Sequence, residues 1–459
     1  MADGNQEQAE HLFEAAAMCQ RRGEGNAALD LYRRVIAMAP QRAGAYMAVA
    51  NILKDQGKLA AAVAHLRRAT IAIAPSAAAY ADLGLYLCRL QQYDAAAEAI
   101  AKSLALEPHR AGTLVNQGIL LHKMGDFPGA IGAYDQALAF EPENPFARWN
   151  RGLTLLADGD LQRGFADYEY RARIPGAGPR DPGIPLWQGE NLYRKTLIVH
   201  AEQGIGDTLQ FLRYVPFLAA AGARIVFGPQ VELMALLKDF PGIAQLAPPG
   251  STIAADFHVP LMSLAHRFGT TLESIPSKTP YLIPPAGLSA TLTQPRGSKL
   301  RIGLVWAGRP THQDDHARSM PLEELLTLTD LTAATFYSLQ IGERAKDIEA
   351  CGAAGLIHDL SPQLTDFSVT AAVLTELDLV ISVDTAIVHL AGAMGRRCFV
   401  LLPFAADWRW LRQRDDSPWY PTLRLFRQAS PGDWAGVMPR LRAAIEQMLL
   451  PRRAGSGAP

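Results

Sequence analysis

The feature that most constrains this chain is an internal repeat of about 34 residues across its first 175 positions. Prolines stand at positions 40, 75, 108, 142 and 175, so they are 35, 33, 34 and 33 residues apart. Two series of small residues and one series of bulky residues keep a constant step of 34. Their members are Ala16, Ala50, Gly84, Gly118 and Gly152; Ala28, Ala62, Ala96, Ala130 and Gly164; and Tyr32, Leu66, Ile100, Tyr134 and Tyr168. Three independent series in one register predict a solenoid of repeated units.

The chemistry of these positions predicts paired helices. Small side chains let two helices cross closely, a bulky one fills the groove of the next unit, and proline ends the second helix. Turn glycines stand at 23, 57, 125 and 159, with Gln91 at the remaining turn. The pattern resembles the tetratricopeptide repeat, with about five units over residues 7–172, within a repeat domain 1–172. That resemblance implies an all-α solenoid whose groove docks a protein. A self-assembly scaffold and a support packed on the rest of the chain are the alternatives.

The fifth unit departs from the pattern. Its second helix carries a run of charged residues, which predicts a cap that faces solvent at the end of the stack. The run comprises Arg163, Asp167, Glu169, Arg171 and Arg173.

Charge and cysteine usage exclude several classes of protein. The chain has 44 basic and 45 acidic residues, so nucleic acid is not an expected partner. Its four cysteines have no C-x-x-C spacing, which predicts neither a zinc site nor a disulfide framework. The start of the chain lacks the apolar core of a signal peptide, and the apolar run 379–394 is interrupted by Asp384 and His389. We expect a cytoplasmic protein with no membrane span.

Beyond a glycine- and proline-rich linker at residues 173–195, the period changes. Short apolar runs alternate with helical stretches, which predicts parallel sheets covered on both faces. Strands are expected at 196–200, 223–227, 300–306, 335–340, 378–383 and 398–402, and helices near 207–221, 231–240 and 433–450. A turn-rich hinge at 283–298 separates two doubly wound lobes, 196–290 and 291–450, before a tail at 451–459. Ligands of such sheets bind beyond the carboxyl ends of the strands.

The first chemical motif is His200-Ala-Glu-Gln-Gly-Ile-Gly-Asp207. Gly204 and Gly206 allow a tight turn and close approach of a ligand, and a helix is expected to start at Asp207. The motif is not a Walker loop, because no lysine follows it. Asp207 is either a helix cap or a general base that accepts a proton from an acceptor hydroxyl.

The run Gln203-Gly-Ile-Gly-Asp207 resembles the N-terminal motif of the bacterial heptosyltransferase-like glycosyltransferases. This resemblance covers about residues 185–445 and implies a GT-B fold, that is, an α/β fold of two Rossmann-like lobes. It implies an inverting transfer in which Asp207 is the base. The attached repeats and residues 187–214 resemble the subgroup related to flagellin glycosyltransferases, which makes flagellin a candidate acceptor.

The second motif is Val383-Asp-Thr-Ala-Ile-Val-His389. An expected strand runs into Asp384 and Thr385, and the free N–H groups of the following helix form a natural phosphate site. The resemblance implies that Asp384, Thr385 and His389 contact the nucleotide-sugar donor. The alternative is a pair of capping residues and a buried histidine.

The third motif follows the first strand of the second lobe. Arg309 and Arg318 could neutralise the donor phosphates, and His312 is a further candidate for donor contact. The pair His312 and His316 also fits a metal, but Gly308 and Pro310 disfavour the helix that such a pair needs. The only Asp-x-Asp of the chain, Asp158-Gly-Asp160, lies in a repeat turn. We therefore expect no metal ion and no cofactor beyond the donor substrate.

The fourth motif is the aromatic and arginine-rich segment 407–421. Trp408 could stack on a sugar or base and the arginines could meet phosphate, although a packed surface segment fits equally. Gln340, at the end of an expected strand, is a weaker candidate for contact with the nucleobase.

Together these motifs predict an inverting, metal-independent glycosyltransferase that modifies a Ser or Thr hydroxyl of a protein held by the repeats. A sugar-to-sugar transferase of surface polysaccharide or lipopolysaccharide synthesis is the alternative within enzymes. A non-catalytic adaptor with a vestigial nucleotide-sugar fold is the alternative outside them. The sequence names neither the sugar nor the nucleotide.

Overall fold

The computed structural model of the chain describes residues 2–71, 76–176, 178, 182–292, 294–310 and 315–450. The chain forms two compact units that divide between Thr154 and Leu155. The four cysteines, which all lie within the described ranges, form no disulfide with one another.

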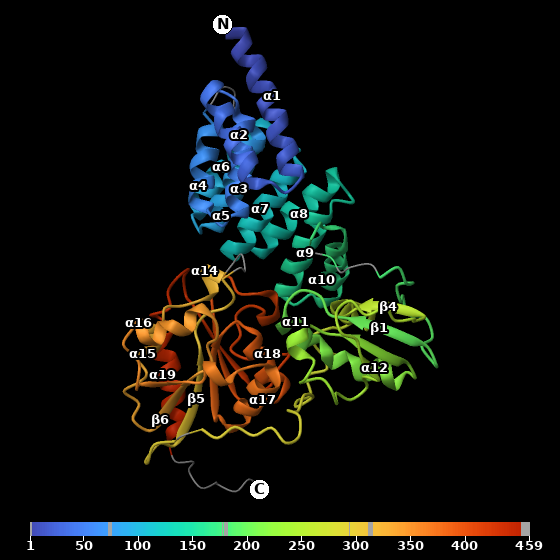
Figure 1. Cartoon of the computed structure of the whole chain (residues 1–459), viewed down its shortest axis with the longest axis vertical. Coiled ribbons are helices and arrows are strands. Elements are labelled where there is room, and N and C mark those ends of the chain that lie inside the picture. Colours follow the sequence, from blue (N-terminus) through green and yellow to red (C-terminus); the bar gives the residue numbers. More distant parts are fainter. Residues whose placement is uncertain are drawn as a thin grey trace. The chain divides into compact units, whose positions relative to one another are not determined.

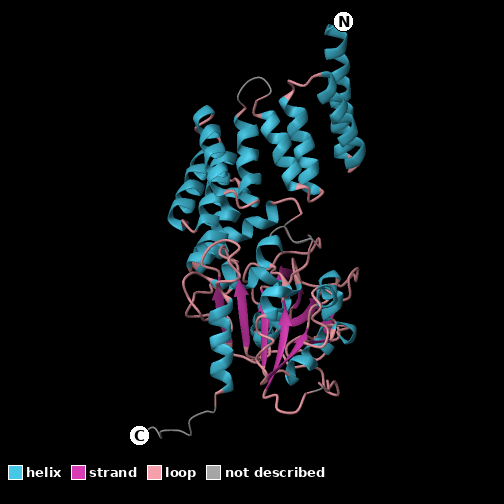
Figure 2. Cartoon of the chain, turned by 90° about the vertical axis from the view of Figure 1, so that its left-hand side faces the viewer, coloured by secondary structure: helices cyan, strands magenta, loops and turns pink. Residues whose placement is uncertain are grey.

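The first unit consists of helices packed side by side in pairs (Figures 1 and 2). They are α1 (Ala2–Arg21), α2 (Gly25–Met38), α3 (Ala43–Asp55), α4 (Leu59–Ala69), α5 (Ala77–Arg89), α6 (Tyr93–Leu106), α7 (Ala111–Met124) and α8 (Phe127–Phe140). Helix α9 (Pro145–Asp158) begins in this unit and ends in the next. The turn glycines 23, 57 and 125 have φ of +78°, +75° and +85°, and Gln91 adopts the same left-handed conformation at +59°. The irregular turn position in the sequence therefore has the same geometry as the others.

The three residue series lie between the helices, as the repeat requires. Ala28, Ala62, Ala96 and Ala130 are all 0% exposed, and the bulky series is buried as well. At Gly84, a Cβ would lie 2.6 Å from the Ile100 side chain, and at Gly118 it would collide with the Tyr134 ring. Glycine is required there because the bulky residue of the second helix occupies the space of a side chain.

The end of the fifth helix pair belongs to the second unit. Helix α10 (Leu161–Tyr168) continues into the 3-10 turn η1 (Glu169–Arg173), and its apolar face is buried. Arg163 and Arg173 are exposed, but Asp167 and Arg171 are only 5% and 1% exposed. The prediction of a charged cap in solvent is therefore wrong for these two residues, because their element packs against the first sheet. The compact unit also begins before the expected boundary at residue 172.

The first sheet has four parallel strands in the order β3-β2-β1-β4. They are β1 (Thr196–His200), β2 (Arg224–Gly228), β3 (Gln245–Leu246) and β4 (Phe257–Pro260). The helical elements around it are α11 (Ile205–Phe211), η2 (Leu212–Tyr214), α12 (Val215–Ala220), η3 (Val231–Leu233), η4 (Leu261–Ser263) and α13 (Leu264–Arg267). The expected helix at 231–240 is wrong. The segment forms the 3-10 turn η3 followed by further turns, with backbone hydrogen bonds from Met234 to Val231, from Leu237 to Leu233 and from Phe240 to Leu237, and Pro241-Gly242 follows directly.

The second sheet has six parallel strands in the order β10-β9-β8-β5-β6-β7 (Figure 2). They are β5 (Leu300–Val305), β6 (Ala334–Ser338), β7 (Ile357–Asp359), β8 (Leu379–Val383), β9 (Cys398–Leu402) and β10 (Leu423–Arg427). Numbered within this lobe, the order is 3-2-1-4-5-6, that of doubly wound dinucleotide-binding sheets, in which ligands bind where the order reverses. Here that switch point lies between β5 and β8. The predicted α/β class is confirmed for this part of the chain.

The second lobe also contains a set of helical elements. They are α14 (Asp315–Arg318), α15 (Leu322–Leu326), η5 (Glu343–Lys346), α16 (Asp347–Ala350), η6 (Ser361–Gln363), α17 (Phe367–Glu376), α18 (Ala386–Ala393), η7 (Trp408–Trp410) and α19 (Met438–Leu449). One apolar cluster joins residues of β5, β6, β8, α15 and α19. The described residues of the expected hinge 283–298 form no helix or strand.

A first prediction concerns the boundary between the units. A fragment of residues 155–459 should fold and melt cooperatively, whereas a fragment of 173–459 should melt lower or aggregate. The shorter fragment lacks α10 and Arg171, so it exposes the apolar surface that α10 covers and leaves Glu202 without its buried partner. Circular dichroism melting of both fragments tests this. Equal melting points would show that α10 adds nothing to the second unit.

Candidate functional site

The switch point of the second sheet brings two of the predicted donor residues together. Arg318, at the end of α14, donates from Nη1 to the backbone carbonyl of Asp384 at 3.3 Å and from Nε to Asp315 at 3.2 Å. Gly308 lies so close that a Cβ there would collide with the Arg318 guanidinium. The loop after β5 and the end of β8 thus converge on one cationic side chain.

Helix α18 starts at this point. Thr385 is its N-cap residue, but the Thr385 side chain makes no capping hydrogen bond; its Oγ1 lies 3.0 Å from Ser382 Oγ. The first amides of α18 are therefore not capped by this side chain, and the helix dipole favours an anion there. Burial, and after it the charge of Asp407, raise the pKa of the neighbouring Asp384 to about 6. The alternative interpretation of Asp384 and Thr385 as capping residues is therefore met only in position: Thr385 is the N-cap residue, but its side chain does not cap the helix.

Helix α11 carries Asp207 as its third residue rather than its first, because the helix begins at Ile205 with Gly204 as N-cap. Asp207 Oδ2 accepts the Gly204 N–H at 2.7 Å, and Oδ1 accepts a hydrogen bond from Arg409. The structure therefore contains the cap that the sequence offers as the simpler alternative. The role of Asp207 as a base stays a prediction.

The starts of α11 and α18 lie against each other (Figure 1). A Cβ on Gly206 would lie 2.7 Å from His389 Cδ2 and 3.6 Å from the Cα of Ala386. Glycine is needed at 206 for this approach of helix to helix. Two helix N-termini, each following a central strand of its own sheet, thus meet at the carboxyl edges of both sheets.

His389 is buried at this contact, with 5% of its surface exposed. Its Nδ1 lies 3.0 Å from the Tyr420 hydroxyl, and its ring stacks on Trp410 with centroids 5.5 Å apart. Burial holds the pKa of His389 well below its usual range, and the charges of Arg409 and Arg213 act in the same direction. The alternative of a buried neutral histidine describes this structure; donor contact by His389 stays a prediction.

Mutation of His389 and of Arg318, the two donor-binding candidates, should have different effects on stability and on donor binding. His389→Ala removes a packed ring and should cost about 2–4 kcal/mol of unfolding free energy. Arg318→Ala removes a partly exposed side chain and should change stability little, while it weakens donor binding by about 1.5–3 kcal/mol. Melting without ligand, followed by calorimetric titration of a nucleotide sugar, measures both. A His389→Ala protein with unchanged melting would contradict the packing role.

Two further predicted contacts are occupied by the protein itself. Gln340 is 4% exposed, and its Oε1 accepts the N–H groups of Trp306 at 3.2 Å and Ala307 at 2.9 Å. Trp408 is 4% exposed, with other aromatic rings packed around it. They are Phe165, Tyr168, Phe211 and Trp419. Neither side chain is free to meet a nucleobase or sugar, because Gln340 is bonded to backbone amides and Trp408 is packed among other rings.

Arg309 and His312 are the remaining candidates for donor contact. Arg309 is exposed beside Gly308. His312 lies outside the described residues, so the structure says nothing about a metal site formed by His312 and His316. Among the residues that the structure describes, no three His, Cys, Asp or Glu side chains are grouped for a metal ion.

Three buried arginines make contacts around the site, and sequence reasoning gave none of them this role. It named Arg409 only among the arginines of segment 407–421 that could meet phosphate and Arg171 only in the charged run, and it did not name Arg213. Arg409 contacts Asp207, Gln210 and Asp407 through its side chain. Arg213, 3% exposed, donates to the carbonyl of Trp419 at 2.8 Å and so joins the first lobe to the second. The sequence signal that could have pointed to the buried positions of Arg409 and Arg213 is the number of aromatic residues in the segments around them.

The third buried arginine joins η1, the turn that continues α10, to the loop after β1. Arg171 makes a bidentate ion pair with Glu202, at 2.9 Å from Nε and 2.7 Å from Nη2, and Nη2 also donates to Ser263 at 2.8 Å. Although burial opposes it, the charge of Glu202 raises the pKa of Arg171. The neighbouring Gln203 bonds the Tyr168 hydroxyl from Nε2 at 2.9 Å. The glycine motif after β1 therefore also anchors the last repeat helix.

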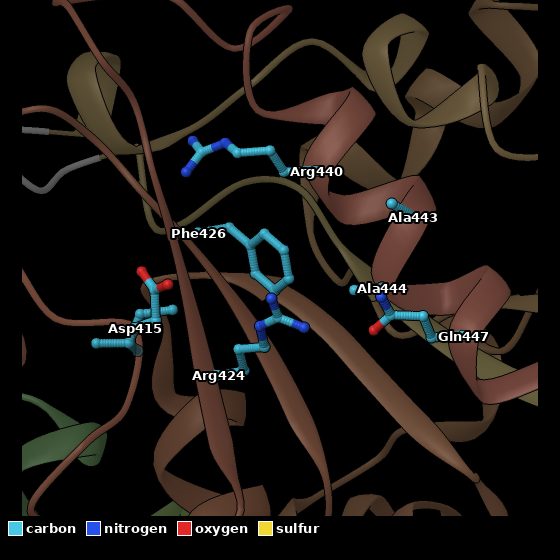
Figure 3. Close-up of a pocket in the computed structure, with 8 residues that line it drawn as sticks. Asp415, Arg424, Phe426, Arg440, Ala443, Ala444 and Gln447 are labelled. Atoms are coloured by element: carbon cyan, nitrogen blue, oxygen red, sulfur yellow. The ribbon is translucent and has the colours of Figure 1, made fainter.

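A separate hollow lies between β10 and α19 (Figure 3). It measures about 230 Å³ and is lined by Asp415, Arg424, Leu425, Phe426, Arg440, Ala443, Ala444 and Gln447. It contains none of the predicted site residues and is smaller than ligand pockets of about 300–1,000 Å³. We do not assign the donor to it.

The comparisons with known proteins define the class of the first unit. Residues 20–78 match the tetratricopeptide repeat model and residues 118–159 match a TPR repeat model. The chain therefore contains tetratricopeptide repeats, which indicate docking of a protein partner. No helix within the described ranges is long and apolar enough to cross a membrane.

One curated relative is protein FlbA of Caulobacter vibrioides, 27% identical over 292 residues. The match covers 58% of this chain and 48% of FlbA, so the chain spans about half the length of that relative. Among solved structures, MamA is 21% identical, covers 38% of this chain and 100% of its own, and has a TM-score of 0.32. PilF of Pseudomonas aeruginosa is 18% identical, covers 39% and 81%, and has a TM-score of 0.34. Structural similarity with TM-scores this low carries no argument about the fold or function of this chain.

Proposed function

We propose that this chain is an inverting glycosyltransferase of the GT-B type that transfers a sugar from a nucleotide-sugar donor to a Ser or Thr hydroxyl of a docked protein. One observation carries the proposal. Arg318 and the N-terminus of α18, which the Thr385 side chain does not cap, meet at the switch point of a doubly wound sheet, next to the start of α11 with Asp207. This supplies positive charge for phosphates and a carboxylate for an acceptor on neighbouring helix starts.

In the proposed reaction, Arg318 and the α18 amides bind the donor phosphates. The acceptor hydroxyl attacks the anomeric carbon opposite the nucleotide, and Asp207 accepts its proton. The bond from sugar to phosphate breaks, and the nucleotide leaves with the electron pair. Attack from the opposite face inverts the anomeric configuration. The absence of an Asp-x-Asp beyond the repeats favours transfer without a metal, which activity in EDTA would test.

The acceptor follows from the repeats. Tetratricopeptide repeats dock proteins, and a docked acceptor has a high effective concentration at the site. Residues 187–214 and the attached repeats resemble flagellin glycosyltransferases, so flagellin is the acceptor protein that we propose. We propose that the reaction takes place in the cytoplasm.

Co-expression of the full chain with flagellin in cells that make nucleotide sugars tests this proposal. Intact-mass spectrometry should show flagellin heavier by whole sugar units on Ser or Thr, and co-expression with Asp207→Asn should leave it unmodified. Unmodified flagellin together with sugar added to a polysaccharide or lipopolysaccharide precursor would contradict the protein acceptor. Nucleotide-sugar binding without transfer to any acceptor would favour an adaptor.

A further inference from the structure

Arg409 is held on several sides in the second unit. Its Nη1 donates to Asp407 at 2.8 Å, its Nε donates to Gln210 at 2.7 Å, and its Nη2 donates to Asp207. The guanidinium lies over the Trp408 ring, 4.3 Å from the ring centroid. Only 9% of the side chain is exposed, so these contacts leave the planar guanidinium one orientation.

The Asp207 carboxylate is fixed at both of its oxygens. The Gly204 N–H binds Oδ2 from within the same helix turn, and Arg409 binds Oδ1 from the other lobe. A carboxylate held by two donors in different directions keeps one rotamer. Its remaining lone pairs therefore point in a constant direction, which is what proton transfer to a base requires.

Trp408, on which the Arg409 guanidinium lies, packs in turn against the last repeat helix, α10. Trp408 meets the Phe165 ring edge to face at 5.6 Å and the Tyr168 ring at 6.5 Å, and both residues belong to α10. The groups with charge or a titratable proton that interact with Asp207 or with Arg409 come from four elements. They are Arg409 itself and Asp407 at η7, Tyr168 on α10, His389 on α18 and Asp384 next to the end of β8. Among these, Arg409 carries the positive charge that touches the carboxylate.

We infer that Arg409 is a positioning residue of the transfer reaction, which holds the Asp207 carboxylate in its working orientation. The inference rests on the proposed function, because it gives Asp207 the role of base. Arg409 acts through Asp207 and is not assigned a contact with substrate.

The test follows the Asp207 carboxyl directly, without a substrate. The full chain is labelled with ¹³C at the aspartate carboxyls, the Asp207 signal is assigned by its loss in Asp207→Asn, and the signal is titrated by NMR. In Arg409→Gln it should titrate about 1–3 pH units above the wild type, because loss of an adjacent positive charge favours the protonated acid. Arg409→Lys should give a smaller upward shift, since an ammonium cannot bridge Asp207, Asp407 and Gln210 together.

Arg213→Gln is the matched control. It removes an equally buried arginine from the contact between the lobes, but Arg213 does not bond Asp207, so the Asp207 titration should stay close to the wild type. If Arg409→Gln fails to fold, Arg409→Lys decides. An Asp207 signal that titrates as in the wild type in every folded Arg409 variant would overturn the inference.

The kinetic consequence separates this inference from the proposed function. In an active enzyme, Arg409→Lys should lower kcat and leave the acceptor KM little changed. A wild-type chain that transfers no sugar would overturn the proposed function, while the titration would still report on Arg409. A shifted titration with unchanged kcat would overturn the positioning role alone.

Discussion

Asp207→Asn should lower the turnover number by about 10²- to 10⁴-fold, the range expected for loss of a general base. Donor affinity should change little, because the donor phosphates are assigned to Arg318 and α18. The asparagine oxygen can still accept the Gly204 N–H, so the helix start should remain intact. Steady-state kinetics with separate donor titration measures both quantities.

Asp407→Asn is the control for this variant. Asp407 is the second carboxylate on Arg409, so either substitution removes one charged hydrogen bond from the same guanidinium. Each should cost about 1.5–3 kcal/mol of unfolding free energy. Only Asp207→Asn should lose most of its turnover. Near-normal turnover of Asp207→Asn would leave Asp207 as a helix cap.

Glu202→Ala should give the largest loss of stability, about 3–5 kcal/mol, because it leaves Arg171 buried without its main partner. Arg171 is 1% exposed, and its remaining carboxylate neighbour is Glu169 at 2.7 Å. For a unit of this size, such a loss lowers the melting transition by roughly 6–20 °C. Differential scanning calorimetry of the full chain should show the change in the transition of the second unit.

The double variant Arg171→Met with Glu202→Leu separates burial from pairing. Removal of both charges from a buried pair is often neutral or stabilising, so this protein should melt close to the wild type. If the double variant melts as low as Glu202→Ala, packing of α10 rather than the unpaired charge explains the loss.

Much of the fold could be predicted because its determinants are local. The repeat register depends on residues 34 positions apart, and even the exceptional Gln91 takes the turn conformation of the glycines. Strand β9 appears at its expected residues because it is a continuous, fully buried apolar run, as central parallel strands are. Strand β1 also appears at its expected residues, with the three apolar residues Leu197–Val199 at its centre. The edge strands β7 and β10 were missed because exposed residues interrupt them.

The site could be predicted only where its residues share a motif. Asp384 follows β8 directly and Asp207 stands in the first turn of the helix after β1, so their positions could be found from sequence spacing. Arg409 and Asp207 are 202 residues apart, and Arg213 and Trp419 are 206 apart, so no spacing rule joins either pair. The direction of a side chain also depends on tertiary packing.

Binding of a nucleotide sugar at the switch point tests the central claim most directly. Thermal melting of the wild type and Arg318→Ala should be compared with UDP-, GDP-, ADP-, dTDP- and CMP-sugars. A donor present at about 100 times its Kd stabilises by about 2.7 kcal/mol, so at least one should raise the wild-type melting point clearly. Arg318→Ala should lose most of that rise. If no nucleotide sugar shifts the wild type, or if Arg318→Ala shifts equally, the donor site proposed here is wrong.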